Sequence, residues 1–470
     1  MIDKELVVKE YEAHKETLAH NHRLIDVYDG NLLHYLEKEL RATFSEDTFK
    51  SIKARLAPIN LLKKVVQKLS PVYSPPPSRR IVGTDQDKEI FDWYVENLNP
   101  NKFFRRAARF YSLARSCLVE SLIDNGSPKM RVMRNDGYFV IGDDPVDEER
   151  VTHVVKFEKR LKGHKQVTVF FVYTDTEFLI FDDDLDEYRE EMFLIGNPEG
   201  VNRLGRLPFS YEKDSEIRLF PRPDSDTFKM TMLIPVILSD LNYATMYQCF
   251  SIIYTMNIDS SEFTISPNVV VEMKQQPGTE GDPSIGQIKP TVDYAGVLQT
   301  LQTQVALWLN SRGIRPGAVG AATQENVQNG ISKMIDEMDT YEIRRELANT
   351  FESLENGFWE RLIRVEHPYY VANGLLPNEY AKPFSADAYV DITFAPQNAA
   401  FSKKDKILEL KEEMGIGLTT RRRAIAELNP LMNDDEIDEL IAELEAENTT
   451  TVEGSFTGSE DENEESSTDG

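Results

Sequence analysis

The chain has 470 residues, a formal net charge of −27 and 40% apolar residues. This length predicts two or more domains or subdomains, and the apolar content is enough for a packed core. The acidic balance argues against a protein that grips nucleic acid over its whole surface, because such binding uses clustered Lys and Arg. It leaves open a protein that lets nucleic acid pass without holding it.

The two cysteines, Cys117 and Cys249, are too few for a disulfide framework. Each lies in an apolar segment with helical spacing, so we expect two packed free thiols and a reducing compartment. The opening residues, MIDKELVVKEYEAHK, lack the basic and then apolar layout of a secretory signal peptide.

The segment up to about residue 70 is expected to be helical, because apolar residues recur every three or four positions in LIDVYDGNLLHYLEKEL. A further helix in APINLLKKVVQKL ends at SPVYSPPPSRR, where the prolines stop it. Two more helices follow. One lies in DKEIFDWYVENL, and the other lies in KFFRRAARFYSLARSCLVESLID and ends at Asn125-Gly126.

The apolar period then changes to two, which predicts β-strands. The strand candidates are RVMRNDGYFVIG, THVVKFEK, KQVTVFFVYTD and TEFLIFDDD. We therefore expect a mixed α+β region up to about residue 220. A loop or edge follows in RLGRLPFSYE, marked by Gly205 and Pro208.

The apolar segment from Met230 to Met256 is long enough to span a membrane. Polar residues such as Asp240 lie inside it, Pro235 interrupts it and no basic cluster flanks it, so a membrane span is the less favoured interpretation. We expect instead a helix at about 227–257 that is buried on nearly every side, in a large core or between subunits.

A short insert at 258–290 separates this helix from the next one. It begins strand-like in EFTISPNVVVEMK and continues turn-rich in QQPGTEGDPSIGQIKP. A helix is expected again at about 291–312. The loop that follows, RGIRPGAVGAATQENVQNGISKM, has four glycines and no charge between Arg315 and Glu325.

The longest predicted helix follows this loop. Apolar residues from Val327 to Val365 keep steps of three and four over about forty residues, which is about 60 Å of helix. No globular core of this size needs such a helix, so we expect it to be shared between neighbouring subunits. One more strand at 385–396 and short helices at 401–446 precede an acidic tail without bases, which is expected to be disordered.

Catalytic and cofactor motifs are weak throughout the sequence. There is no GxxxxGK[ST] loop, no GxGxxG after a strand, no HExxH and no GxSxG. Arg421-Arg422-Arg423 could contact phosphate, but such a triplet beside acidic helices more often forms a salt-bridging face. The sequence therefore predicts neither an enzyme nor a resident metal or cofactor.

The densest acidic cluster before the tail is the one feature that could bind a divalent cation. An EF-hand would need alternating oxygen ligands and a glycine that this segment lacks. The cluster is either a solvated acidic turn or a metal site. Its members are Asp182, Asp183, Asp184, Asp186 and Glu187.

The order of these parts resembles the portal proteins of tailed bacteriophages over about residues 20–446. APINLLKKVVQKLSPVYSPPP is similar to the family's early helix and its Pro-containing exit, and GRLPFSYE is similar to its step into the stem. SDLNYATMYQ matches the acid, aromatic residue and Asn of the first stem helix. QNGISKM is similar to the Ser-Gly-apolar stretch that opens the long helix, with Asn329 in place of the usual Ser.

The resemblance implies an α+β fold, mostly helical, with wing, stem, clip and crown and one very long helix. The implied parts are the wing (1–225 and 331–400), the stem helices (226–257 and 290–312), the clip (258–289), the tunnel loop (313–330), the crown (401–446) and the tail (447–470).

The resemblance also implies the function. About twelve copies would form a closed, cyclically symmetric ring at one capsid vertex. The ring would conduct double-stranded DNA during packaging and ejection, and would dock the terminase large subunit and then the neck proteins. Major capsid and scaffolding proteins are further implied partners. The protein would reside in the virion after assembly in the host cytoplasm, with no membrane contact.

Two sets of residues are the candidate functional sites. Small side chains and backbone freedom would let the tunnel loop follow a moving duplex, whereas Lys or Arg there would pair with phosphates. The DNA-channel candidates are Gly317, Ala318, Val319, Gly320, Ala321, Ala322, Thr323, Gln324 and Asn326. The clip candidates for docking the motor and neck are Glu262, Glu272, Lys274, Glu280 and Asp282.

Two alternatives stay open at this point. The first is a scaffold or adaptor protein that forms rings or filaments without a DNA channel, and the position of the small-residue loop distinguishes it from the portal interpretation. The second is a metal-dependent hydrolase that uses the carboxylates at 182–187, which cation binding and turnover would reveal.

Overall fold

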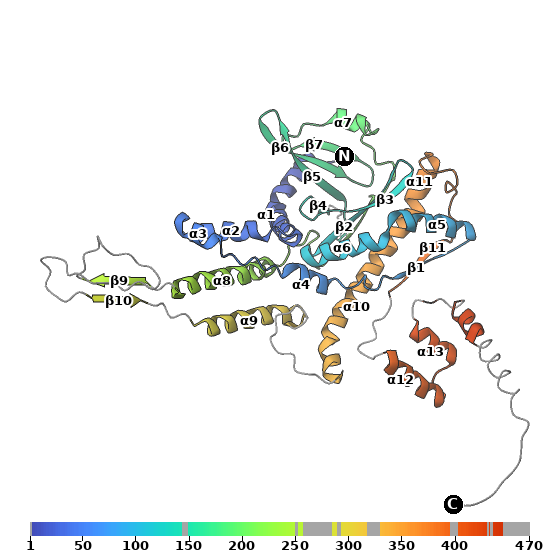
Figure 1. Cartoon of the computed structure of the whole chain (residues 1–470). Helices are drawn as coiled ribbons and strands as arrows, with labels where there is room; N and C mark the ends of the chain where they lie inside the picture. The colour runs from blue at the N-terminus through green and yellow to red at the C-terminus, as the bar shows by residue number, and fades with distance from the viewer. Residues whose placement is uncertain are drawn as a thin grey trace, which may run out of the picture.

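The protein combines helices with antiparallel sheets, so the α+β prediction is confirmed. The computed structural model describes residues 2–142, 149–249, 252–256, 284–288, 293–316, 330–394, 403–429, 432 and 436–444. Figure 1 shows an α+β region in the centre, two helices that project from it to one side, and further short helices near the C-terminus.

Four N-terminal helices surround one apolar cluster. They are α1 (Lys4–Asp29), α2 (Leu32–Thr43), α3 (Glu46–Lys53) and α4 (Leu62–Leu69). α1 ends at Gly30, whose left-handed backbone (φ 119°) lets its N–H bond to Asp26 and Val27. Leu24, Leu36 and Phe49 meet in the cluster between these helices, and all three are buried.

A strand replaces the end of one predicted helix. α5 (Asp85–Leu98) and α6 (Pro100–Ala114) lie where helices are expected, but α6 stops before Arg115, and β2 runs over Ser116–Asp124. The prediction of helix to Asp124 is therefore wrong, and Cys117 is a buried free thiol on a strand. Residues 116–121 are all buried although only Cys117, Leu118 and Val119 among them are apolar, so the sequence does not alternate and periodicity does not separate this strand from the end of a helix.

Two antiparallel sheets follow, and the strands predicted between residues 131 and 184 are confirmed. One sheet has the order β3-β2-β8 and the other the order β4-β5-β6-β7. α7 (Arg189–Leu194) is a short helix after the second sheet. The strands are β3 (Ser127–Val132), β8 (Phe209–Lys213), β4 (Tyr138–Ile141), β5 (His153–Lys162), β6 (Lys165–Tyr173) and β7 (Phe178–Asp182).

A two-stranded sheet joins distant parts of the chain. β1 (Ser78–Val82) pairs antiparallel with β11 (Tyr389–Thr393), with Ser78 opposite Thr393. β11 lies within the predicted strand at 385–396. β1 directly follows the proline run and was not predicted, because a strand of five residues beside prolines has little pattern of its own.

The projecting helices are α8 (Ser225–Cys249) and α9 (Tyr294–Asn310). Beyond them, β9 (Ile252–Met256) pairs antiparallel with β10 (Ser284–Ile288). The helix predicted to about 257 therefore ends early, and the turn-rich prediction is wrong for 284–288. No helix among the described residues is long and apolar enough to cross a membrane.

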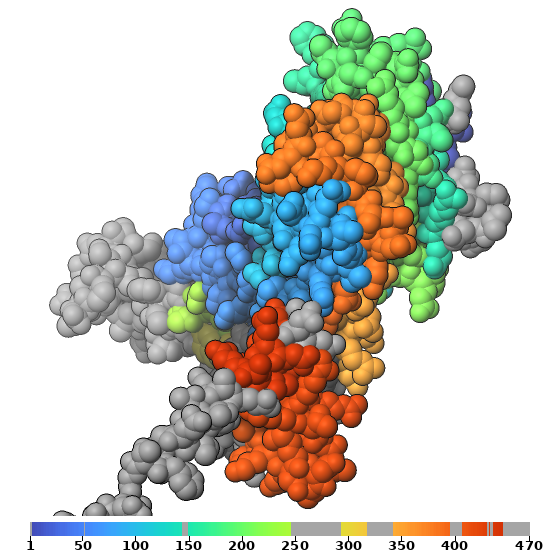
Figure 2. Space-filling view, turned by 90° about the vertical axis from the view of Figure 1, so that its right-hand side faces the viewer, coloured from blue at the N-terminus to red at the C-terminus, as the bar shows by residue number. Residues whose placement is uncertain are grey.

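A continuous helical run follows the loop. It consists of α10 (Gly330–Arg361), the π-helical turn η3 (Leu362–Glu366) and α11 (His367–Ala372). The expected helix of about forty residues is thus an α-helix of 32 residues extended by a π turn. Figure 2 shows the orange residues of this run beside the light-blue residues of α5, where Tyr94 Oη lies 3.0 Å from His367 Nδ1.

The C-terminal helices form a separate group in Figure 1. They are α12 (Lys403–Gly415), α13 (Arg421–Leu428) and a helical segment at 436–444. The short helices predicted at 401–446 are confirmed for these residues. The predicted acidic tail lies outside the described residues.

Buried ion pairs attach the α10 run to the α+β region. Glu355 is fully buried and accepts Arg79 Nε at 2.5 Å, Arg79 Nη2 at 2.9 Å and the Tyr73 hydroxyl at 2.6 Å. Burial, together with the Glu355 carboxylate, raises the pKa of Tyr73 well above its usual range, so the hydroxyl stays a donor. Arg79 also donates to Asn101 at 2.6 Å.

A second buried pair lies further along the same run. Arg361 Nε donates to Glu366 at 2.7 Å, and its other nitrogens donate to Ser210 at 2.7 Å and Ser121 at 3.1 Å. Ser121 in turn donates to Glu366 at 2.7 Å. The run is thereby bonded to both β2 and β8.

Removal of the Glu355 carboxylate should destabilise the fold strongly. Glu355→Ala leaves Arg79 buried and unpaired, so we expect a loss of about 3–5 kcal/mol in the free energy of unfolding. Urea unfolding followed by tryptophan fluorescence measures it. The matched control is Glu360→Ala, an exposed carboxylate on the same helix, with an expected change within about 0.5 kcal/mol. Equal losses in the two variants would contradict the role given to the buried pair.

Candidate functional site

The projecting helix α8 lies between two apolar clusters of the same chain. Met232, with Phe228 and Val236, packs on the side of α1 and α2. Ile234, with Leu233, packs on the other side, against α9 and α4. The first half of this helix is therefore covered within one chain, which for these residues agrees with the first of the two predicted alternatives, burial in a large core.

The second projecting helix, α9, carries no charged side chain from Tyr294 to Asn310. Leu301, Val305, Trp308 and Leu309 bury one face against α8 and α4. The opposite face is exposed and consists of uncharged polar residues with isolated leucines. Its exposed members are Ala295, Leu298, Gln299, Thr300, Gln302, Thr303, Gln304, Leu307 and Asn310.

Arg312 fastens the end of α9 to the start of α8. Its guanidinium donates to Asp224 at 3.0 Å and to Asp226 at 2.7 Å, and it lies over the Trp308 ring at 5.8 Å. The left-handed Gly313 (φ 62°) then turns the chain. The start of the loop is therefore held in place relative to α8.

The sequence-predicted site residues lie outside the described residues. This holds for the whole DNA-channel set from Gly317 to Asn326 and for the whole clip set from Glu262 to Asp282. What the structure places is their surroundings. In the chain, the channel candidates follow Ile314, which is buried beside α9, and the clip candidates come after β9 and before β10, two strands that pair with each other.

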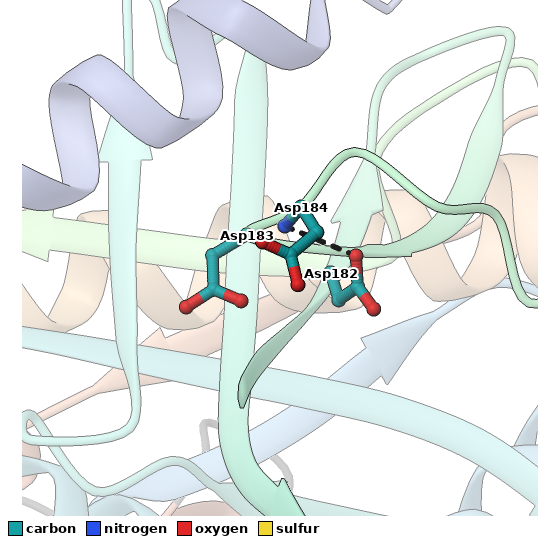
Figure 3. A group of neighbouring side chains, drawn as sticks. All are labelled: Asp182, Asp183 and Asp184. Atoms are coloured by element: carbon teal, nitrogen blue, oxygen red, sulfur yellow. Dashed lines mark hydrogen bonds between the residues drawn. The ribbon is translucent and has the colours of Figure 1, made fainter. Parts of the chain in front are cut away.

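The acidic cluster at the end of β7 has a buried centre. Asp182 is fully buried, and its Oδ1 accepts the backbone N–H of Asp184 at 3.1 Å and of Asp186 at 3.0 Å. Its Oδ2 accepts Lys162 Nζ at 2.7 Å and the Tyr188 hydroxyl at 3.3 Å. Figure 3 shows the three consecutive aspartates with the bond from the Asp184 backbone to Asp182.

Lysines compensate the neighbouring carboxylates of this cluster. Lys165 donates to Asp184 at 2.6 Å, and Lys162 donates to Asp186 at 2.6 Å. Burial raises the pKa of Asp182, but the bonds from Lys162 and the Asp186 backbone outweigh it, so the pKa lies below the usual 3.8.

Ligand oxygens of Asp182, Asp183 and Asp184 lie within 4.8 Å of one another, close enough to hold a cation. A cation there would have to displace the lysine ammonium groups that already neutralise Asp182 and Asp184. The geometry therefore makes Asp182 the acceptor that holds the turn at 182–188, and it supplies neither a free ligand set nor a general base for a hydrolase.

One member of the arginine triplet, Arg422, forms an ion pair, which agrees with the salt-bridge interpretation for that residue. Arg422 Nε donates to Asp438 at 2.7 Å, which joins α13 to the helical segment at 436–444. This contact lowers the pKa of Asp438 through the hydrogen bond from Arg422.

Sequence analysis missed the charged residues that hold α10 and the end of α9 in place. Arg79, Glu355 and Arg312 are single charged residues among many, and their partners are distant in the chain. A charged residue within an apolar helical stripe, such as Glu355 beside Leu354 and Phe358, was the available signal. That signal does not identify the partner.

Comparison with known proteins gives structural likeness only. No family model and no curated protein matches the sequence. The structure is similar to a chain from the "neck of native GTA particle computed with C12 symmetry", with TM-score 0.42 and 11% identity over 82% of this chain and 94% of that chain.

Two further solved structures show comparable likeness. A chain from the "neck of empty GTA particle computed with C6 symmetry" has TM-score 0.43 and 9% identity over 78% of this chain and 89% of that chain. A chain from the virion of a native gene transfer agent (GTA) particle has TM-score 0.38 and 12% identity over 82% and 93%. These TM-scores and identities assign no role to this chain, so the function proposed below rests on its own residues.

The contacts of Arg312 predict that it holds the end of α9. Arg312→Gln removes charged hydrogen bonds to two half-exposed aspartates, so we expect a loss of about 1–2 kcal/mol in local stability. Hydrogen exchange of the amides at 309–314 should become faster. Arg189→Gln is the control, because that side chain is 82% exposed in its ion pair. Unchanged exchange in the Arg312 variant would show that the anchor is not needed.

The environment of Asp182 predicts a difference between two adjacent aspartates. Asp182→Ala leaves several donors unpaired, so we expect a loss of about 2–3 kcal/mol in the free energy of unfolding at neutral pH. Asp183→Ala, at an exposed neighbour, should change it by less than about 0.5 kcal/mol. Thermal unfolding of both variants measures the difference.

The pH dependence of the same variants follows from the direction of the pKa shift. Because the folded state lowers the pKa of Asp182, its carboxylate stabilises the fold above its usual pKa of 3.8, and this contribution is lost as the pH falls through the lower folded value. The difference in free energy of unfolding between wild type and Asp182→Ala should therefore become smaller below about pH 4. A gap that stays constant into strong acid would contradict this assignment.

Proposed function

We propose that this chain is a portal-type protein that forms a ring around double-stranded DNA at a capsid vertex. One observation carries the proposal: α9 is a 17-residue helix without a charged side chain, in a chain where 28% of residues are charged. Its exposed face is uncharged and largely Gln and Thr. Such a face suits a surface that a polyanion passes without binding.

The physical argument concerns phosphate charge. A cationic wall would pair with the phosphates and release counterions, which makes each step along the duplex costly. A strongly acidic wall would repel the duplex over the range of the Debye length. A neutral, hydrated wall in a protein of net charge −27 allows contact at close range while the protein as a whole repels DNA.

The projecting pair supports the assignment of stem and clip. α8 and α9 pack on each other. β9, which follows α8, pairs with β10, which precedes α9, at the end of the two helices that is far from the α+β region (Figure 1). In the proposed ring α8 and α9 are the stem. The insert is the clip, and its residues Glu262, Glu272, Lys274, Glu280 and Asp282 would dock the terminase large subunit and then the neck proteins.

Anchored residues flank the proposed tunnel loop. Before it, Arg312 is bonded to Asp224 and Asp226, and after it, Glu355 holds α10 to Arg79. The small residues from Gly317 to Ala322 would then contact the duplex. The α+β region with α10 would be the wing, α12 and α13 with 436–444 would be the crown, and capsid and scaffolding proteins would contact the wing.

Negative-stain electron microscopy of the full-length protein tests the ring directly. The portal proposal expects closed rings of about twelve copies with a central opening wide enough for a duplex. Filaments, or rings without an opening, would instead support the alternative of a scaffold or adaptor protein. A compact monomer at all concentrations would overturn both proposals.

Charge placed on α9 tests whether its exposed face lines the channel. Gln299→Lys with Thr303→Lys should leave ring assembly intact, and the rings should retain a linear duplex at higher salt than wild type, because each lysine adds a phosphate contact. Gln166→Lys with Thr176→Lys adds the same charge at exposed positions of the β-sheet region and should behave as wild type. Loss of rings only in the α9 variant would place this face between subunits and overturn the channel assignment.

A further inference from the structure

Positive charge is concentrated in two segments of this acidic chain. Neither residues 48–84 nor residues 97–119 contain an Asp or Glu, although together they contain thirteen Lys and Arg. The first segment includes α4 and the second includes α6. These two helices pack against each other in the fold.

The packing of α4 turns its lysines outward. Leu62 and Val66 are buried in the cluster with α1 and α2, and Val65 is buried in the cluster with α9. The remaining face exposes Lys63, Lys64 and Lys68. Within the described part of the chain, no ion pair neutralises these three lysines. By contrast, Lys50 and Lys53 on the preceding α3 pair with Asp47 and Glu37.

A row of bases on α6 continues this surface. Lys102, Arg105 and Arg109 follow each other at helical spacing, and the next residue in the row, Ser112, donates to the carbonyl of Leu69 at the end of α4. Arg105 itself donates to the carbonyl of Tyr73, just beyond α4. These two bonds place the row on α6 beside the end of α4 and the residues that follow it.

We propose that this surface, named here the α4–α6 basic surface, binds the phosphate backbone of double-stranded DNA. Its residues are Lys63, Lys64, Lys68, Lys102, Arg105 and Arg109. The three lysines of α4 span about 7.5 Å of helix axis, and phosphates of one strand follow each other every 3.4 Å or so. Backbone contacts of this kind bind without sequence preference.

The side chains of the surface favour a duplex over other polyanions. A protein partner needs a buried apolar centre, and lysine is depleted from such centres, whereas the outward face of α4 has only Lys and Gln. A membrane partner needs exposed apolar residues to insert, and this face has none within α4. The proposal therefore commits to double-stranded DNA as the ligand.

This inference deepens the proposed function and rests on it for the identity of the ligand. Val65 of α4 belongs to the same apolar cluster as the buried face of α9, and Figure 1 shows α4 at the base of the projecting pair. A duplex that passes the neutral face of α9 would therefore reach a cationic surface nearby. The neutral helix would permit sliding, and the basic surface would retain DNA where the projecting pair joins the α+β region.

Fluorescence anisotropy with a labelled duplex of mixed sequence tests the surface on the full-length protein. Lys63→Gln, Lys64→Gln and Lys68→Gln are combined in one variant. We expect its affinity at about 0.1 M salt to fall at least about tenfold, and the slope of log K against log salt to decrease by about 2–3, because each lost phosphate contact removes about 0.9. The matched control combines Lys9→Gln, Lys38→Gln and Lys159→Gln, three exposed lysines elsewhere with the same change of charge.

The control variant should bind within about twofold of wild type. Equal loss in both variants would overturn the proposal, because overall charge would then explain binding. Removal of residues 447–470 provides a second arm. If the lysine substitutions on α4 lower the duplex affinity only after the acidic tail is removed, the tail occupies the surface and the proposal is wrong. Lysine-dependent binding of poly-glutamate without lysine-dependent binding of the duplex would also overturn it.

The failure of this inference is distinguishable from failure of the ring proposal. Open rings for which both lysine variants bind DNA equally would overturn only the basic surface. Filaments or monomers in which the α4 variant alone loses the duplex would overturn the ring and leave the surface in place.

Discussion

Burial of two carboxylates along one helical run is the constraint on which the rest of the structure depends. Glu355 and Glu366 are fully buried, and an isolated charge at such depth would cost several kcal/mol. Glu355 is compensated by Arg79 and Tyr73 of a distant segment. Glu366 is paired with Arg361 of the same run and also accepts the hydroxyl of Ser121 from β2. The position of α10 is therefore coupled to the correct assembly of β1, β2 and β8.

The folded molecule has separate surfaces of different charge. α9 is neutral, the α4–α6 basic surface is cationic, and the chain as a whole is strongly acidic. α4 and α9 lie near each other because Val65 of α4 shares one apolar cluster with the buried face of α9. A chain that handles a polyanion benefits from such a division, since repulsion, sliding and retention require opposite electrostatics and therefore separate surfaces.

Sequence periodicity succeeded and failed for physical reasons that particular elements illustrate. β5 and β6 were predicted from alternating stretches such as QVTV, although β6 is buried on both faces. Phe170 and Val172 lie in one apolar cluster, and Val167 and Val169 lie in another. β2 is buried on both faces over residues 116–121 and follows α6 almost directly, so its sequence resembled the end of that helix. The acidic run after β7 resembled a cation site because Lys162 and Lys165, which neutralise it, come from the neighbouring hairpin of the sheet.

The sequence by itself determined the helical and alternating segments, the acidic character of the chain and the neutral character of α9, because each depends on residue type and local spacing alone. Only the tertiary structure decided which charges are compensated and which remain exposed. Glu355 is satisfied by Arg79 and Tyr73, which are far away in the chain, and Asp182 is satisfied by Lys162 of the neighbouring hairpin. Lys63, Lys64 and Lys68, by contrast, face outward without an ion pair in the described part of the structure. Charge pairing acts through distance in space, which local sequence does not specify.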